Sequence, residues 1–335
     1  MGKKKTVILV ILLSGTVLVS LLIFSKMYMA NESGGNTYQH GTLSIDKEFL
    51  VYVDHEEGLQ TLNLANELTG ETQRLISAKE GDQILDPTVN SASRNVTYLA
   101  NSPEKTSLYS IDFDSHKIEK HMTMDAPVRE FVESNEKIFY VKGNYQHSDD
   151  EGNPFHFYDI YSYDSNTEEH QQLTKKDALY ISSLVFDDQS QKLYFIMNQS
   201  KSGDPFEAEQ GLYELSIKDQ TIQRIETGHQ DIFDADFNTA QNEIIFSGIS
   251  NPDSGSTYKY ELFSVNLDTH KTKRLTFLEA FVTDPVYSES TNQVYFAYNK
   301  KFPGRNYTNF DLYKLDREAL ETEKSSYQFR ELGKE

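Results

Sequence analysis

The feature that most constrains this chain is a short phrase that recurs about every fifty residues. Its clearest form is Leu-Tyr-x-Leu closed by Asp, Asn or Ser, and successive copies start 49 to 52 residues apart. The copies begin at Leu59, Leu108, Ile160, Leu212, Leu262 and Leu312. Apolar residues that alternate with polar ones are typical of a strand with one buried face, and the closing residue favours a turn. Six copies therefore predict six β-rich units.

Two further phrases complete each period. Before the Leu-Tyr phrase come an aromatic or apolar residue, a polar turn and an apolar strand that ends in an aromatic residue. These copies are Val89–Tyr98, Phe131–Tyr140, Phe186–Phe195, Phe237–Phe246 and Tyr287–Phe296. A polar phrase follows and ends at Leu173, Ile225 and Leu275, thirteen residues after the start of the Leu-Tyr phrase. In the first period its copy ends at Leu75, and we interpret the longer spacing as an insertion around Leu68–Gly70. Each period thus holds four short strands.

Four strands per period, six times over, predict an all-β fold, namely a six-bladed β-propeller of four-stranded blades. One such sheet cannot bury two apolar faces alone, whereas a closed ring of sheets can. We place the propeller at residues 38–332, with blades near 38–76, 85–122, 126–173, 180–226, 232–276 and 283–332. In the last blade we expect a short helical stretch at Arg317–Lys324 before an outer strand at Tyr327–Leu332.

The amino-terminal segment predicts one transmembrane helix. Thr6–Phe24 is an uncharged run of roughly 28 Å as a helix, close to the hydrocarbon thickness of a bilayer. Lys3, Lys4 and Lys5 precede it and predict a cytoplasmic tail at residues 1–5. Residues 25–37 would form a stalk, so the propeller would lie outside a cell membrane that the chain crosses once. Secretion after signal-peptide cleavage is the alternative, although Tyr28 suits a cleavage site before Asn31 poorly.

Charge and composition exclude several classes of function. The formal net charge is −20, and the part after the basic amino terminus is more acidic still, so we expect no nucleic-acid partner. The absence of Cys excludes disulfides, thiolate catalysis and cysteine-based zinc sites. The negative net charge otherwise indicates only that the protein is soluble. The alternative interpretation is that it binds a cation or a basic partner.

Three acidic phrases point to a known family. Leu85-Asp-Pro87, Asp234-Ala-Asp236 and Thr283-Asp-Pro285 each lead into a polar turn, an apolar strand and the Leu-Tyr strand. Over residues 38–332 this arrangement resembles the TolB-type propeller repeat. The resemblance implies a six-bladed propeller, and related propellers serve as extracytoplasmic scaffolds or precede a serine peptidase domain. We expect no peptidase domain here, because the sixth period uses the sequence to residue 332.

The longest connections between strands predict a binding surface. Residues 142–158, 198–211, 248–259 and 300–310 all lead into a Leu-Tyr strand, so in a propeller they share one face, which we call the long-loop face. Long loops on a rigid scaffold commonly carry binding residues. The candidates on this face are Asp149, Asp150, Glu151, His156, Tyr158, Asp204, Glu207, Asp253 and Arg305.

Two acidic groups raise the question of a metal. Asp149–Asn153 offers several oxygens for Ca²⁺ but lacks the alternating spacing of a calcium loop, so we expect a solvated turn and no metal, with Ca²⁺ as the alternative. Asp86, Asp234 and Asp284 recur at the start of predicted inner strands and would line one mouth of the channel. We expect them to cap strand amides rather than to gather a cation.

These observations predict a non-catalytic binding or scaffold propeller. It would engage a protein or cell-envelope partner through the long-loop face and the membrane through residues 6–24. The sequence holds no Gly-x-Ser-x-Gly, no His-Glu-x-x-His and no phosphate-binding glycine loop. The alternative is a propeller hydrolase of glycosidase or lactonase type, with carboxylates that converge at the channel mouth from separate blades.

Overall fold

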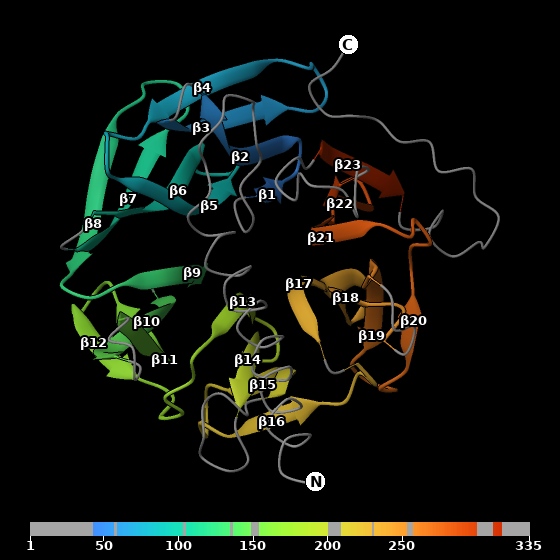
Figure 1. Cartoon of the computed structure of the whole chain (residues 1–335). Helices are drawn as coiled ribbons and strands as arrows, with labels where there is room; N and C mark the ends of the chain where they lie inside the picture. The colour runs from blue at the N-terminus through green and yellow to red at the C-terminus, as the bar shows by residue number, and fades with distance from the viewer. Residues whose placement is uncertain are drawn as a thin grey trace, which may run out of the picture.

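Six antiparallel sheets stand radially around a central axis, as blades of an all-β six-bladed propeller (Figure 1). The computed structural model describes residues 43–56, 59–102, 105–134, 137–148, 154–199, 209–229, 231–252, 257–299 and 311–316. No α-helix occurs in these ranges, and the one helical element is a 3₁₀ turn at Thr239–Gln241. None of the described residues belongs to a helix long and apolar enough to cross a membrane. The predicted tail, span and stalk lie outside these ranges.

Each blade uses consecutive strands, with the first strand nearest the axis (Figure 1). Blade 1 contains β1 (Leu43–Asp46), β2 (Phe49–Glu56), β3 (Leu59–Asn66) and β4 (Thr72–Ser77); blade 2 contains β5 (Gln83–Asn90), β6 (Asn95–Asn101), β7 (Thr106–Asp112) and β8 (Ile118–Met124). Blade 3 contains β9 (Val128–Ser134), β10 (Lys137–Ser148), β11 (Pro154–Asp164) and β12 (Glu169–Gln172); blade 4 contains β13 (Ile181–Asp187), β14 (Lys192–Gln199), β15 (Glu209–Ser216) and β16 (Ile222–Ile225). Blade 5 contains β17 (Ile232–Asn238), β18 (Glu243–Ile249), β19 (Tyr260–Asn266) and β20 (Thr272–Arg274); blade 6 contains β21 (Phe281–Ser288), β22 (Gln293–Asn299) and β23 (Asp311–Asp316). The outer strand and helical stretch predicted after residue 316 lie outside the described residues.

The core lies between the blades, where strand alternation places apolar side chains on both faces of each sheet. In β14, Leu193 and Phe195 pack toward blade 3, whereas Tyr194 and Ile196 pack toward blade 5. Five hydrophobic clusters among the described residues each join two neighbouring blades. Full burial of such a side chain contributes about 1.5–3 kcal/mol, so stacking of blades is the main stabilising interaction.

The strand register corrects the first copy of the repeat. Phe49 of β2 pairs with Asn66 of β3, as Asn95 pairs with Asp112 in blade 2. The first Leu-Tyr phrase is therefore Leu62–Asn66 and not the copy that begins at Leu59. The side chain of Asn66 accepts the N–H groups of Leu68 and Thr69, which fixes this turn. Leu75 then follows Leu62 by the usual thirteen residues, so the insertion predicted around Leu68–Gly70 was wrong. Two leucines three residues apart both satisfied the pattern, and only cross-strand pairing distinguishes them.

Four inner strands carry a bulge at an equivalent point. The pairing of inner and second strand shifts at Leu85/Thr88, Ser182/Val185, Ile232/Ala235 and Thr283/Val286. Within three of these bulges one residue has a left-handed backbone: Asp86 (φ 46°), Ser183 (φ 54°) and Asp284 (φ 49°). A bulge re-aims side chains, and here it lies on strands that surround the axis.

Inner-strand side chains link each blade to the next by hydrogen bonds. Five successive interfaces contain such a bond from a backbone N–H group to a side-chain oxygen: Ser91 to Asp46 at 2.7 Å, Phe131 to Asp86 at 2.6 Å, Leu184 to Glu130 at 3.0 Å, Ala235 to Ser183 at 3.0 Å, and Tyr287 to Asp236 at 2.7 Å. The inner strand is the edge of its sheet, so its outward amides lack a strand partner. The side chains of the preceding blade supply the acceptors.

The ring closes through a buried carboxylate. Glu67 follows β3 of blade 1, and its side chain is 5% exposed. Its Oε2 accepts hydrogen bonds from the hydroxyl of Tyr295 and from Nζ of Lys314 at 3.3 Å, both in blade 6. These contacts fasten the last blade to the first.

Candidate functional site

Most of the predicted binding residues lie outside the described ranges. This applies to Asp149, Asp150, Glu151, Asp204, Glu207, Asp253 and Arg305. His156 lies in β11, where its backbone alone is described, and Tyr158 is described fully. The strands that flank these connections are described. The connections join β10, β14, β18 and β22 to the next strand of the same blade, so all four lie at the same end of the blades. The inner strands start at the same end of the blades, so their first residues surround the axis on the long-loop face, and we call this end the channel mouth.

An arginine framed by two tyrosines stands at this mouth. The guanidinium carbon of Arg129, near the start of β9, lies 5.2 Å from the ring centroid of Tyr158 and 5.0 Å from that of Tyr180. Tyr158 belongs to β11 and Tyr180 precedes β13, so the group joins blades 3 and 4. Backbone hydrogen bonds between Tyr158 and Ala178, at 2.7 and 3.1 Å, hold the two segments together. Aromatic faces attract a guanidinium and fix its position.

Carboxyl groups of three inner strands, Asp86, Glu130 and Asp234, lie close enough to influence one another. Burial raises the pKa of Glu130 to about 7, although the N–H of Leu184 and the charge of Arg129 act in the opposite direction. Burial, together with repulsion from Glu130, also raises the pKa of Asp86 well above its ordinary value. Both residues are half-buried, and the protein that encloses them on most sides accounts for the loss of hydration.

The three predicted channel residues all lie on inner strands, but not at strand starts. Asp86 is the fourth residue of β5, Asp234 the third of β17 and Asp284 the fourth of β21. Asp86 accepts the N–H of Phe131 in the next blade. Asp234 accepts the hydroxyl of Thr283 and, at 3.4 Å, the N–H of Asp284. Asp86 and Asp234 therefore accept strand amides, as predicted, but these amides belong to the next blade and do not lie at its strand start.

The sequence reading missed Arg129, Glu130 and Tyr180. The inner strand of blade 3 lacks an Asp-Pro or Asp-x-Asp phrase, so no pattern marked its charged residues as candidates. A charged Arg-Glu pair between Val128 and Phe131, in a strand expected to be buried, was the available signal. The acidic turn Asp149–Asn153, for which Ca²⁺ was only the alternative, lies outside the described residues. Within those residues, no three His, Asp or Glu side chains come together in a way that would hold a metal ion.

Two carboxyl groups near this mouth have raised pKa values and also accept amides of the next blade. A carboxyl with a pKa near 7 has the acidity that general acid catalysis requires. Oε2 of Glu130, however, accepts the N–H of Leu184 at 3.0 Å, and Oδ2 of Asp86 accepts that of Phe131. These oxygens maintain the contact between blades.

Comparison with known proteins agrees with the fold. A family model for the dipeptidyl peptidase IV N-terminal region matches residues 129–255, which run from blade 3 into blade 5. Comparison with curated proteins gives no match. TolB from Acinetobacter baumannii is similar in structure, with a TM-score of 0.57, 15% identity, and 82% of this chain and 62% of that chain covered. The chain thus spans less than two thirds of that TolB.

Other solved structures share the architecture. A putative TolB from Agrobacterium tumefaciens gives a TM-score of 0.57 at 13% identity, over 76% of this chain and 84% of that one. An oligogalacturonate lyase in complex with manganese gives 0.55 at 9% identity, over 84% and 76%. The protein is therefore a six-bladed β-propeller that is similar in fold to TolB. At such identities the likeness defines the fold and leaves the activity to be argued from the residues.

Proposed function

We propose that this protein is a membrane-tethered propeller that binds a protein or cell-envelope partner outside the cytoplasm, through its long-loop face and without catalysis. The observation that carries the proposal is the channel mouth on that face. Arg129 is held there between Tyr158 and Tyr180. Arginine and tyrosine are enriched among residues that dominate binding energy at interfaces.

The surrounding connections support the same function. Four of them open on this face, and loops on a rigid scaffold commonly carry binding residues. The acidic character of the chain, at −20, favours a partner with a basic surface. The uncharged run at residues 6–24, with the preceding lysines, supports tethering with the propeller outside.

A photo-crosslinking experiment in intact cells tests the binding face. Benzoylphenylalanine replaces Tyr158 on the long-loop face in one strain. In another it replaces Thr167, which lies in the exposed turn at the other end of the same blade. We expect a specific crosslinked partner from position 158 and none from position 167. Equal crosslinking from both positions, or crosslinking from 167 alone, would contradict the proposed face.

The competing function, a hydrolase of glycosidase or lactonase type, is favoured by one observation, the pKa of Glu130 near 7. Such an enzyme would lose turnover when this carboxyl is replaced. The purified full chain and its Glu130→Gln variant are therefore compared on glycoside and lactone panels. We expect no turnover that depends on Glu130, and a loss of turnover in the variant would establish the hydrolase instead.

A further inference from the structure

Blade 3 contains a polar pocket of about 390 Å³ that is open to solvent. It lies over β10, β11 and β12 and the connection that follows them. Its lining includes two lysines, Lys142 and Lys175, and two aspartates, Asp159 and Asp177. Small-molecule sites begin at roughly 300 Å³. Successive side chains of a strand point to opposite faces, so Asp159 lies on the opposite side of β11 from Tyr158.

Blade 5 provides an internal reference for this pocket. It repeats this part of blade 3 with an offset of 102 residues, so that Glu261 stands where Asp159 does. Both carboxylates are fully buried. Each accepts a threonine hydroxyl, from Thr174 at 2.6 Å in blade 3 and from Thr276 at 2.5 Å in blade 5. Each also accepts a backbone N–H of the connection to the next blade, at 2.7 and 2.5 Å respectively. The buried carboxylate therefore accepts hydrogen bonds from the same two kinds of donor in both blades.

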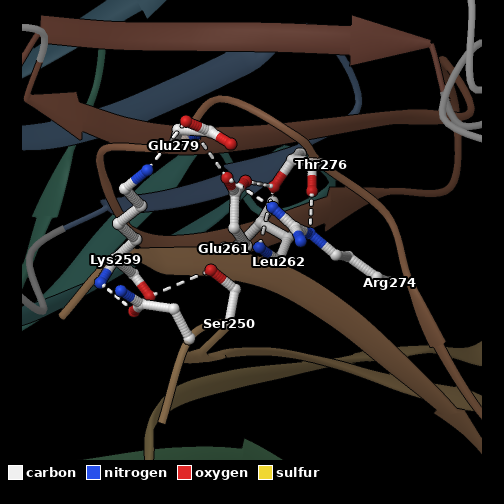
Figure 2. Close-up of polar contacts among 8 residues, drawn as sticks. Ser250, Lys259, Glu261, Leu262, Arg274, Thr276 and Glu279 are labelled. Atoms are coloured by element: carbon white, nitrogen blue, oxygen red, sulfur yellow. Dashed lines mark hydrogen bonds and ion pairs between the residues drawn. The ribbon is translucent and has the colours of Figure 1, made fainter. Parts of the chain in front are cut away.

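In blade 5 the acidic side chains have cationic partners within the chain. Figure 2 shows Glu261 beside Arg274, whose Nη2 lies 3.0 Å from Oε1 of Glu261. It also shows Lys259 reaching Glu279, with Nζ and Oε2 2.7 Å apart. The guanidinium carbon of Arg274 lies 4.4 Å from the ring centroid of Phe277. The chain's own basic side chains thus neutralise the acids of this corner.

Blade 3 keeps the two acids and replaces both cations. Gln172 stands at the position of Arg274, Phe157 at that of Lys259, and Asp177 at that of Glu279. Asn144 replaces the missing cations in part, as a neutral hydrogen-bond donor. Its Nδ2 donates to Oδ2 of Asp159 at 2.7 Å and to Oδ1 of Asp177 at 3.4 Å. Gln172 donates to Asp159 at 3.3 Å.

The four charges of this pocket remain separate. Nζ of Lys142 lies 4.5 Å from the ring centroid of Tyr161, so the aromatic face and not a carboxylate holds it. Within the described part of the chain, Lys142, Lys175, Asp159 and Asp177 form no ion pair with each other. Two positive and two negative groups therefore line one small pocket around an aromatic ring.

We propose that this pocket binds a free α-amino acid, a small zwitterion with an ammonium and a carboxylate group. The ammonium group would lie against Asp177, with the charge of Asp159 behind it. The carboxylate would lie between Lys142 and Lys175, and the aliphatic part would pack on Tyr161. The ammonium group thus supplies the positive charge that Lys259 and Arg274 supply in blade 5. This inference goes beyond partner binding and does not rest on it.

The test uses three matched probes on the full chain in detergent. L-norleucine carries both charges, pentylamine is the same chain without the carboxylate, and hexanoate lacks the amine. Binding is followed by saturation-transfer difference NMR. We expect saturable binding of L-norleucine at about millimolar concentration or below, and binding of the other two at least about tenfold weaker, because each loses one charge-assisted contact.

Variants locate the site. Lys142→Gln and Asp177→Asn are each expected to weaken L-norleucine binding at least about tenfold, and unchanged thermal unfolding shows that both variants fold. Glu279→Gln, at the position in blade 5 that matches Asp177, is expected to leave binding unchanged. No saturable binding of L-norleucine up to about 20 mM, far above the affinity expected of a specific site, would overturn the proposal. Equal affinity for pentylamine, or an unaffected Lys142→Gln variant, would overturn it in favour of a simple cation site.

Discussion

At the scale of single residues, Glu130 shows what enclosure does to an acid. Its pKa is raised to about 7, chiefly by burial, while its Oε2 accepts the N–H of Leu184 in the next blade. The sequence singled out other acids, Asp86, Asp234 and Asp284, because an Asp-Pro or Asp-x-Asp phrase marks them. It did not single out Glu130, since the effect depends on which groups of other blades surround the side chain.

The raised pKa of Glu130 predicts a pH-dependent stability. The folded chain binds a proton at this site between an ordinary pKa of 4.5 and about 7, where the unfolded chain has released it. The free energy of unfolding therefore falls as pH rises through this window. Asp86 and Asp236, whose pKa values are also raised by burial, act in the same direction.

Glu130→Gln should reduce this pH dependence, because the amide keeps an acceptor oxygen but does not ionise. A rise in pKa from 4.5 to about 7 corresponds to roughly 3 kcal/mol, and the partial exposure of Glu130 lowers the expected change to about 1–2 kcal/mol. Urea unfolding of the full chain at pH 5 and pH 8 measures it. Glu119→Gln, at an exposed site on β8, is the control and should match the parent. An unaltered pH dependence in Glu130→Gln would contradict the argument.

At the scale of elements, the bulge in the inner strand is the device that joins one blade to the next. It turns Asp86 out of the regular alternation of β5, with φ at 46°, and brings its Oδ2 to 2.6 Å from the N–H of Phe131. Aspartate and asparagine tolerate this backbone region better than other residues with a Cβ. The same acidic phrase that supports the TolB-type resemblance thus has a structural role here.

Substitution of Asp86 separates its two roles. Asp86→Ala removes the acceptor and places a poorly suited residue at positive φ, so we expect a loss of about 2–3 kcal/mol in the free energy of unfolding. Asp86→Asn keeps a carbonyl oxygen and tolerates the same backbone, and should cost about 1 kcal/mol or less. Denaturant unfolding at pH 7 compares the two. Equal losses from both variants would show that the charge, and neither the hydrogen bond nor the backbone, matters at this bulge.

At the scale of the whole molecule, a propeller is stable only as a closed ring, because every blade buries its faces against neighbours. Five interfaces are joined by side chains that accept an amide in the following inner strand or directly after it. Glu67 closes the ring differently, through Tyr295 and Lys314. Side-chain exposure of 5% for Glu67 and 16% for Lys314 makes this a largely buried ion pair.

Glu67→Ala should therefore loosen the ring. Removal of one partner leaves the ammonium of Lys314 without its counter-charge, at a cost of about 3 kcal/mol. Hydrogen exchange should accelerate first in blades 1 and 6. The exposed pair Arg94–Asp114 is the control, and Asp114→Asn should produce no comparable loss, because solvent screens that pair. Uniform acceleration across all six blades would argue against a local closure contact.

The sequence by itself determined the number of blades, the four strands of the repeat and the faces of the strands that are buried. These follow from local periodicity, because a half-buried strand needs alternating apolar residues and a turn needs its polar residue, wherever the strand lies. Tertiary structure decided the remainder. It placed the first Leu-Tyr phrase at Leu62 and supplied the side-chain acceptors between blades. It also stacked Arg129 on two tyrosines and brought separate charges together around Lys142. All these features depend on residues that are apart in the chain. Local pattern cannot reveal them, because the packing of one blade on the next sets their distances and hydration.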